Sequence, residues 1–287
     1  MFDPLGYFHR HRIALRAQFV QGDASRTIYE CVAFVIKQGW ACLFGGVMLA
    51  LIILTFLFYP DDAVLARYDF LTINAFLIQI GMLVFRLESW AEAKVILVFH
   101  IVGTLMEIFK THVGSWIYPE PSLLRIADVP LFSGFMYACV GSYIARVWRI
   151  FGFNFERFPP LWAQGVLAAL IYLNFFTHHY VIDIRIMLFL GVAGLYGPCI
   201  VRFKADETYR SMPLLLGLFL VSVFIWIAEN IGTYTKTWIY PDQAVGWQMV
   251  SFGKLGSWFL LMIISFVLVS LLHKSEIKTS RESEADK

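Results

Sequence analysis

Charged side chains are scarce in this sequence. Asp, Glu, Lys and Arg make up 15% of its 287 residues, whereas 59% are hydrophobic, and the formal net charge is only +2. This balance lies well outside the composition of ordinary soluble domains. The sequence therefore predicts a protein that resides in a lipid bilayer and binds no nucleic acid.

Cysteine and the common catalytic motifs are also rare or missing. Cys31, Cys42, Cys139 and Cys199 have no paired spacing, so we expect reduced thiols, no disulfide and no zinc site. The chain has no Walker loop, no Gly-x-Gly-x-x-Gly turn, no Gly-x-Ser-x-Gly elbow and no His-rich desaturase pattern. These absences argue against nucleotide-driven pumping and serine hydrolysis, and no cofactor is expected.

Long apolar runs dominate the sequence instead. Each is long enough, or nearly so, for the roughly 20 residues of a spanning helix. They predict an all-α, polytopic membrane bundle of about eight transmembrane helices, and polar positions in the second and sixth runs leave six or seven spans open. The runs lie at about 38–59, 70–86, 91–109, 131–149, 159–177, 184–202, 212–230 and 250–272.

Lysine and arginine are shared unevenly between alternate loops, which sets the orientation. Of the 23 such residues, 17 fall on the side of the two termini. We therefore predict an inner-membrane protein with both termini cytoplasmic, a basic interfacial segment at 1–37 and a disordered tail at 273–287. The six on the outward side are Arg67, Lys110, Arg125, Arg185, Lys236 and Lys254.

One unusual string occurs twice. Glu107 opens the stretch E-I-F-K-T-H-V-G-S-W-I-Y-P-E, and Glu229 opens the stretch E-N-I-G-T-Y-T-K-T-W-I-Y-P-D. The same offset, from 107 to 229, links the Glu, the Thr, the Trp-Ile-Tyr-Pro and the final acid. The sequence thus predicts two tandem four-helix repeats of the same orientation, at 38–150 and 151–272, related by a twofold axis along the membrane normal.

Polar residues at helical spacing surround each Glu. Because an ionised carboxylate at mid-membrane costs roughly 2.5–3.5 kcal/mol, both polar faces should point into the bundle, near its outer surface. Glu107 and Glu229, with His112, are the candidate catalytic groups, and the titratable neighbours of Glu107 favour it as the centre of any chemistry. Alternatively, each Glu only hydrogen-bonds a nearby Tyr, Trp or backbone group and pins its helix to the following loop.

Aromatic and acidic residues complete the candidate site. Aromatic side chains at this position often serve only as interfacial anchors, but their fixed spacing to a Glu, repeated twice, favours a binding site. The candidate substrate-binding residues are His100, Thr111, Trp116, Tyr118, Glu120, Thr233, Trp238, Tyr240 and Asp242, together with His178 and His179 of the third outward loop.

His178 and His179 are followed by Asp183, and His112 lies in a neighbouring outward loop. These residue types can ligate a metal. Adjacent His side chains diverge on a helix, however, and no helical His-x-x-x-His pair is present. We therefore expect no metal and favour histidines that hydrogen-bond or transfer protons.

The sequence resembles one known family closely and another loosely. The run from Glu107 to Tyr143 is similar to the YoaT-like family of bacterial integral membrane proteins, over nearly the whole chain, and this resemblance implies no particular activity. A looser resemblance to the carotenoid hydratase and lycopene cyclase group implies acid–base chemistry on a polyisoprenoid. It rests on Glu107, Gly114, Tyr118, Val129 and Pro130, and the second copy has Ser251-Phe252 in place of the Val-Pro.

Three functions stay open at this point. The first is binding or chemical modification of a membrane lipid or isoprenoid at an outward-facing acidic and aromatic site. The second is secondary transport of a small solute or ion, with the paired Glu residues as coupling groups. The third is a non-catalytic membrane scaffold or sensor. A membrane lipid is the expected partner.

Overall fold

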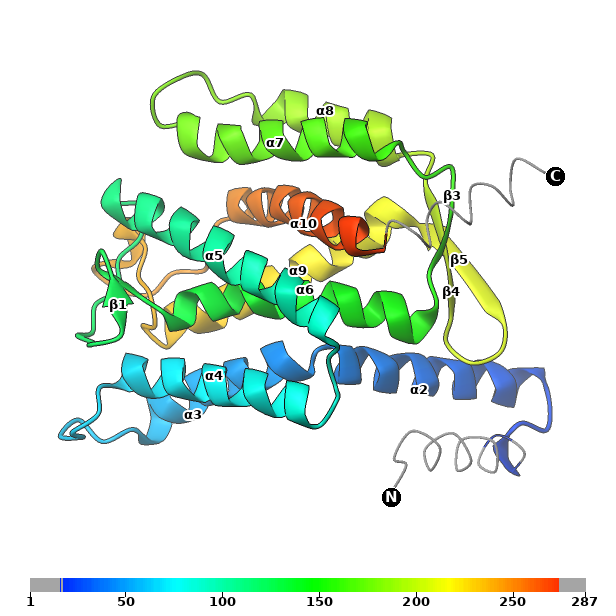
Figure 1. The fold of residues 1–287 in the computed structure, drawn as a ribbon, viewed down its shortest axis with the longest axis horizontal. Coiled ribbons are helices and arrows are strands. Elements are labelled where there is room, and N and C mark those ends of the chain that lie inside the picture. Colours follow the sequence, from blue (N-terminus) through cyan, green and yellow to red (C-terminus); the bar gives the residue numbers. More distant parts are fainter. Residues whose placement is uncertain (1–15, 17, 274–287) are drawn as a thin grey trace.

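A computed structural model describes residues 16 and 18–273 of the chain, which is mostly helical (Figure 1). The tail expected at 273–287 lies outside the described residues except for His273. Most of the first 17 residues of the expected basic segment lie outside them as well. From residue 23 on, that segment belongs to α2 (Asp23–Ala41).

Each of the eight predicted apolar runs contains a helix. Apolar side chains within these runs pack against one another, so the helix boundaries follow the hydrophobic pattern closely. The first four helices are α3 (Leu43–Phe58), α4 (Arg67–Val84), α5 (Trp90–His112) and α6 (Phe132–Phe151); the next four are α7 (Leu161–Thr177), α8 (Arg185–Tyr196), α9 (Leu214–Tyr234) and α10 (Phe252–Leu272).

The all-α expectation needs correction, because two small sheets accompany the helices. A run expected to be helical over 184–202 ends at Tyr196, and Pro198 follows, which cannot continue a helix. The chain then forms β4 (Ile200–Lys204) and β5 (Tyr209–Pro213), which join β3 (Asn154–Glu156) in an antiparallel sheet of order β3-β4-β5. At the opposite end of the molecule β1 (Arg125–Ile126) pairs with β2 (Val129–Pro130).

Fewer helices than expected are able to cross a membrane by length and composition alone. Among the described residues α9 and α10 meet both requirements, and a third span results if α2 and α3, bent by 67° at their junction, are one. The helices α3, α7 and α8 have 16, 17 and 12 residues, short of the roughly 20 that a bilayer needs. The other helices α4, α5 and α6 contain ionisable residues, among them Asp69, Glu107 and Arg146.

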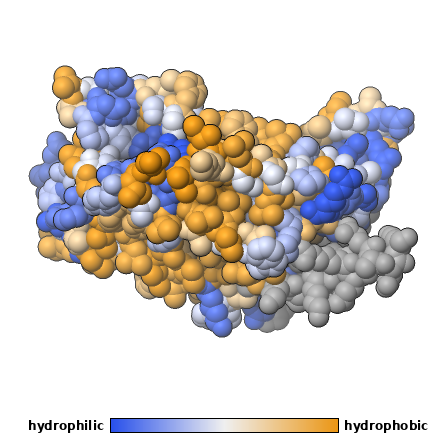
Figure 2. Space-filling model, turned by 90° about the horizontal axis from the view of Figure 1, so that it is seen from above, coloured by the Kyte–Doolittle hydropathy of each residue, from blue (hydrophilic) through white to orange (hydrophobic). Residues whose placement is uncertain are grey.

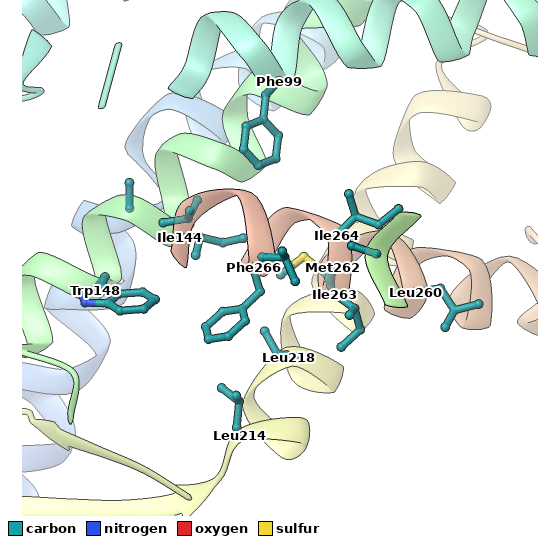
Figure 3. Packing of buried hydrophobic residues seen from close by; sticks show 14 of the residues in the cluster. Phe99, Ile144, Trp148, Leu214, Leu218, Leu260, Met262, Ile263, Ile264 and Phe266 are labelled. Atoms are coloured by element: carbon teal, nitrogen blue, oxygen red, sulfur yellow. The ribbon is translucent and has the colours of Figure 1, made fainter. Parts of the chain in front are cut away.

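The core is centred on α6, which packs most extensively against α5 and also contacts α2, α3, α4 and α10. Figure 3 shows Phe99 of α5, Ile144 and Trp148 of α6, and Phe266 of α10 among the buried residues that meet here. Arg146 and Glu88 form a fully buried ion pair of 3.1 Å beside this core. The core therefore holds both groups of four helices together.

Large apolar side chains also cover the outside of the helices. Figure 2 shows hydrophobic residues over the middle of one face and hydrophilic residues towards its two ends. Apolar patches of this extent mark contact with lipid or another apolar partner. Examples are Phe76 of α4, Leu97 of α5, Leu173 of α7, Leu190 of α8 and Phe224 of α9, which are 56% exposed or more.

Candidate functional site

The two repeated strings meet at one end of the molecule, the string end, on the left of Figure 1 beside β1. Ile117 and Ile239 exchange backbone hydrogen bonds of 3.0 and 2.9 Å in an antiparallel pair. These residues hold the same position in the two strings. An antiparallel pair of equal positions relates the strings locally by a twofold rotation.

The same turn leads into each string. After α5, the N–H of Ser115 donates to the carbonyl of Lys110 at 2.9 Å; after α9, Thr237 donates to Gly232 at 2.9 Å. The residue before each donor is left-handed, Gly114 with φ 73° and Lys236 with φ 53°. This is the Schellman end of a helix, and it turns the chain back so that the Trp lies over the Glu.

Glu107 is the acceptor of three side-chain hydrogen bonds. Its Oε2 accepts from Trp116 Nε1 at 2.6 Å and from the Tyr118 hydroxyl at 2.7 Å, and its Oε1 accepts from the Tyr137 hydroxyl at 2.6 Å. The residue is only 5% exposed. Trp116 and Tyr118 belong to the string, whereas Tyr137 comes from α6, so the carboxylate ties three segments together.

Glu229 repeats this arrangement with two donors. Its Oε1 accepts from Trp238 Nε1 at 3.1 Å and from the Tyr240 hydroxyl, and the residue is 6% exposed. Burial, followed by the neighbouring carboxylate, raises the pKa of both Tyr118 and Tyr240 well above the ordinary value. Both phenols therefore stay protonated donors, and these contacts pin each helix to its loop as the simpler of the two interpretations predicts.

Lys254 lies between the two strings, and sequence reasoning did not assign it a role. Its Nζ is 5.0 Å from the ring centroid of Trp116 and 4.1 Å from that of Tyr240. The two rings themselves meet edge to face at 5.9 Å. Cation–π contact with one ring from each string makes Lys254 part of the shared centre. In the sequence, only its place among the six outward basic residues could have indicated this role.

Glu120 of the first string forms an ion pair with Arg67, which also contacts the second string. Arg67, the first residue of α4, contacts the Glu120 carboxylate and donates to Thr237 Oγ1 at 3.0 Å. The neighbouring Tyr68 hydroxyl donates to the Thr237 carbonyl at 2.9 Å. Asp242, at the matching position of the second string, is exposed and forms no ion pair within the described part of the chain.

Other candidate residues occupy less connected positions. Thr233 is buried and accepts from Trp247 Nε1 at 3.1 Å, whereas Thr111 Oγ1 has no hydrogen bond to any described residue. His100 packs against Phe135 with their rings tilted by 47° and their centroids 4.4 Å apart. His112 is exposed and makes no hydrogen bond with the described residues, so it lies outside the shell of donors around Glu107.

The two adjacent histidines lie beside the string end in the loop between α7 and α8. His178 Nδ1 is 2.9 Å from the Asn174 carbonyl, and His179 Nε2 is 2.8 Å from Lys110 Nζ. Burial lowers the pKa of both histidines, and the charge of Lys110 also lowers that of His179. Over residues 16 and 18–273, no three His, Cys, Asp or Glu side chains converge as a metal would require.

A small apolar groove lies between the middle turns of α5 and α10, with further lining residues from α6, α7 and α9. It encloses about 30 Å³, and its wall includes Met106, Tyr137, Tyr172, Trp258 and Leu268. The Tyr137 ring lies 6.2 Å from that of Trp258. The hydroxyl of the same tyrosine donates to Glu107, so this residue joins the groove to the buried carboxylate.

Comparison with known proteins agrees with the close resemblance found in the sequence. A family model described as "Protein of unknown function (DUF817)" matches residues 30–266. The "Uncharacterized protein YoaT" of Bacillus subtilis (strain 168) is 41% identical over 261 residues, which cover 91% of this chain and 98% of the relative. No solved structure matches the chain.

Proposed function

Because the chain belongs to the DUF817 family, whose description assigns no activity, we propose a function from the site itself. The protein is a multi-pass inner-membrane protein that binds an amphipathic lipid or isoprenoid. The apolar chain of this ligand lies in the groove between α5 and α10, and its polar end faces the acidic and aromatic centre of the two strings.

The distribution of polar and apolar residues supports the membrane placement. Exposed apolar side chains surround the middle of the helices, and the bias of Lys and Arg towards the side of the termini favours that side as the cytoplasmic one. The string end is then the outward end. The two groups of four helices, which carry equivalent turns and equivalent Glu contacts, are proposed to be one duplicated unit in the same orientation.

Tyr137 is the observation that carries the proposal. Its ring belongs to the groove wall and its hydroxyl donates to Glu107 at 2.6 Å. A ligand in the groove would therefore contact a group that is hydrogen-bonded to a buried acid, which is also an arrangement suited to proton transfer. The groove is narrow, and side chains of α5 and α7 meet beside it, with the rings of Phe109 and Phe176 4.8 Å apart. Entry of a lipid chain from the acyl layer therefore requires these side chains to move apart.

A groove-filling variant tests the proposal. Val102 lines the groove, whereas Val98, one turn away on α5, is 44% exposed. Purified protein should retain a specific lipid, identified by extraction and mass spectrometry. Val102→Trp should lose this lipid and Val98→Trp should keep it, because only the first substitution occupies the groove.

Two results would contradict lipid binding. One is that the wild-type protein retains no lipid beyond the composition of the surrounding membrane. The other is that both tryptophan variants retain the lipid equally. If cells lacking the gene differ from wild-type cells in their lipid composition, the protein also modifies its ligand chemically.

Secondary transport is the second candidate, favoured by the pair of buried carboxylates that the two halves bring to one centre. Buried acids at such an interface suit the coupling of a proton or cation to a substrate. Transport predicts that Glu107→Gln and Glu229→Gln stop proton uptake into proteoliposomes equally, with unchanged melting temperatures. Unequal effects of the two substitutions would count against a shared coupling site.

A further inference from the structure

Three cationic side chains gather on one side of the string end, next to the groove. Lys110 lies in the last turn of α5, Arg185 begins α8, and Lys254 lies in the first turn of α10. Each of the three lies within electrostatic range of the other two. They come from three helices that are far apart in the sequence, so the fold assembles this cation cluster.

Lys110 is the least exposed of the three and has no acidic partner. It is 3% exposed; its Nζ bonds to His179 Nε2 at 2.8 Å and lies 4.3 Å from the centroid of the Phe175 ring. Lys254 contacts only aromatic rings at close range. Within the described residues no carboxylate approaches either lysine to the 4.0 Å of an ion pair, although buried charges are normally paired.

The equivalent position in the first group of four helices shows a cation that is paired with an acid of the chain. Arg67 and Arg185 are each the first residue of the second helix of their group. Arg67 is paired with Glu120 of the first string. Arg185 instead turns to Asp183 in its own loop, at 3.3 Å, and the matching acid of the second string, Asp242, does not contact it.

We propose that Lys110, Lys254 and Arg185 bind a phosphate monoester group, placed where the Glu120 carboxylate lies in the other half. The inference rests on the proposed function in one respect, which is that the phosphate is the head group of the lipid in the groove. Three donors from separate helices suit a group with several charged oxygens. His179, on the exposed rim, adds a fourth hydrogen-bonding group that already contacts Lys110.

The neighbouring acids leave room for an added negative charge. Asp183 is shared between Asn174, whose Nδ2 donates to it at 3.1 Å, and Arg185. Glu229 is occupied by Trp238 and Tyr240, and Asp242 is exposed to solvent. These acids lie near the cluster, but none of them forms an ion pair with Lys110 or Lys254 within the described residues. A phosphate would therefore bind the two lysines directly and share Arg185 with Asp183.

The test compares the melting temperature and ligand affinity of purified protein with three probes: inorganic phosphate, a polyprenyl phosphate, and the polyprenol without phosphate. The variants are Lys110→Met and Lys254→Met. Lys94→Met is the matched control, because Lys94 is an exposed lysine at the other end of the same helix α5. Lys110→Met should fold without ligand at least as well as wild type, since it removes a buried cation that lacks an acid.

We expect both phosphate-bearing probes to raise the melting temperature of the wild type and of Lys94→Met. Affinity for them should fall about tenfold to a hundredfold in Lys110→Met and Lys254→Met, the usual range for losing a charged hydrogen bond. Polyprenol should bind all four proteins alike.

The probes also separate this inference from the proposed function. If the polyprenyl phosphate and the polyprenol bind equally, and Lys110→Met changes neither, the phosphate site is wrong and lipid binding stands. If inorganic phosphate binds and depends on Lys110, while neither the polyprenyl phosphate nor the polyprenol binds, the site binds a soluble phosphate and the proposal of lipid binding is wrong. If no phosphate-bearing probe binds, the phosphate site is overturned.

Discussion

At the scale of the residue, the buried carboxylates are held by donors that differ in their distance along the chain. Trp116 and Tyr118 lie close to Glu107 in the sequence, and their counterparts Trp238 and Tyr240 lie equally close to Glu229. Tyr137 is a third donor that only Glu107 has. The sequence indicated Glu107 as the more active of the two acids from its His and Lys neighbours, whereas the structure distinguishes it by this tyrosine and the groove behind it.

Tyr137→Phe should destabilise the protein by about 1–3 kcal/mol, because it leaves a buried carboxyl oxygen of Glu107 without its hydrogen-bond donor. Thermal unfolding in detergent measures the loss. Tyr172→Phe is the control, since Tyr172 also lines the groove but its hydroxyl makes no hydrogen bond with the described residues. Equal melting temperatures for the two variants would show that the bond to Glu107 contributes no stability.

At the scale of the element, α5 and α9 end in the same Schellman turn, which is formed by different residues in the two strings. The left-handed position after α5 is Gly114, and the one after α9 is Lys236. A residue with a Cβ is strained in this conformation, while glycine adopts it freely. The second string therefore folds in spite of its own turn residue, held by the contacts of Trp238 and Tyr240 with Glu229.

Substitutions at these two turn positions should change the free energy of unfolding in opposite directions. Lys236→Gly should raise the free energy of unfolding by about 0.5–1 kcal/mol, and Gly114→Ala should lower it by about 1 kcal/mol or more. Melting curves of the two variants and their double mutant provide the measurement. A stabilising Gly114→Ala would mean that the left-handed turn does not persist in the membrane-embedded protein.

At the scale of the whole molecule, the proposed topology places the string end outside the cell and the β3-β4-β5 sheet inside. Leu123, after the first string, is 90% exposed, and Glu207, in the β4–β5 turn, is also exposed. In a background with the four natural cysteines replaced, Leu123→Cys should react with an impermeant thiol reagent on intact cells. Glu207→Cys should react only after the cells are permeabilised. The reverse pattern would invert the orientation.

The sequence by itself determined which segments contain the long helices, and it grouped each Glu with the Trp and Tyr of its own string. Both conclusions depend on local patterns: apolar runs follow from the need to satisfy backbone groups within a helix, and the strings repeat Glu, Trp and Tyr at fixed short spacings. Only the tertiary structure decided that Tyr137 contacts Glu107, that Arg67 pairs with Glu120, and that β3 joins β4. The partners in these contacts are separated by 30 to 53 residues in the chain. Such contacts depend on how helices and strands pack together, which no local period encodes.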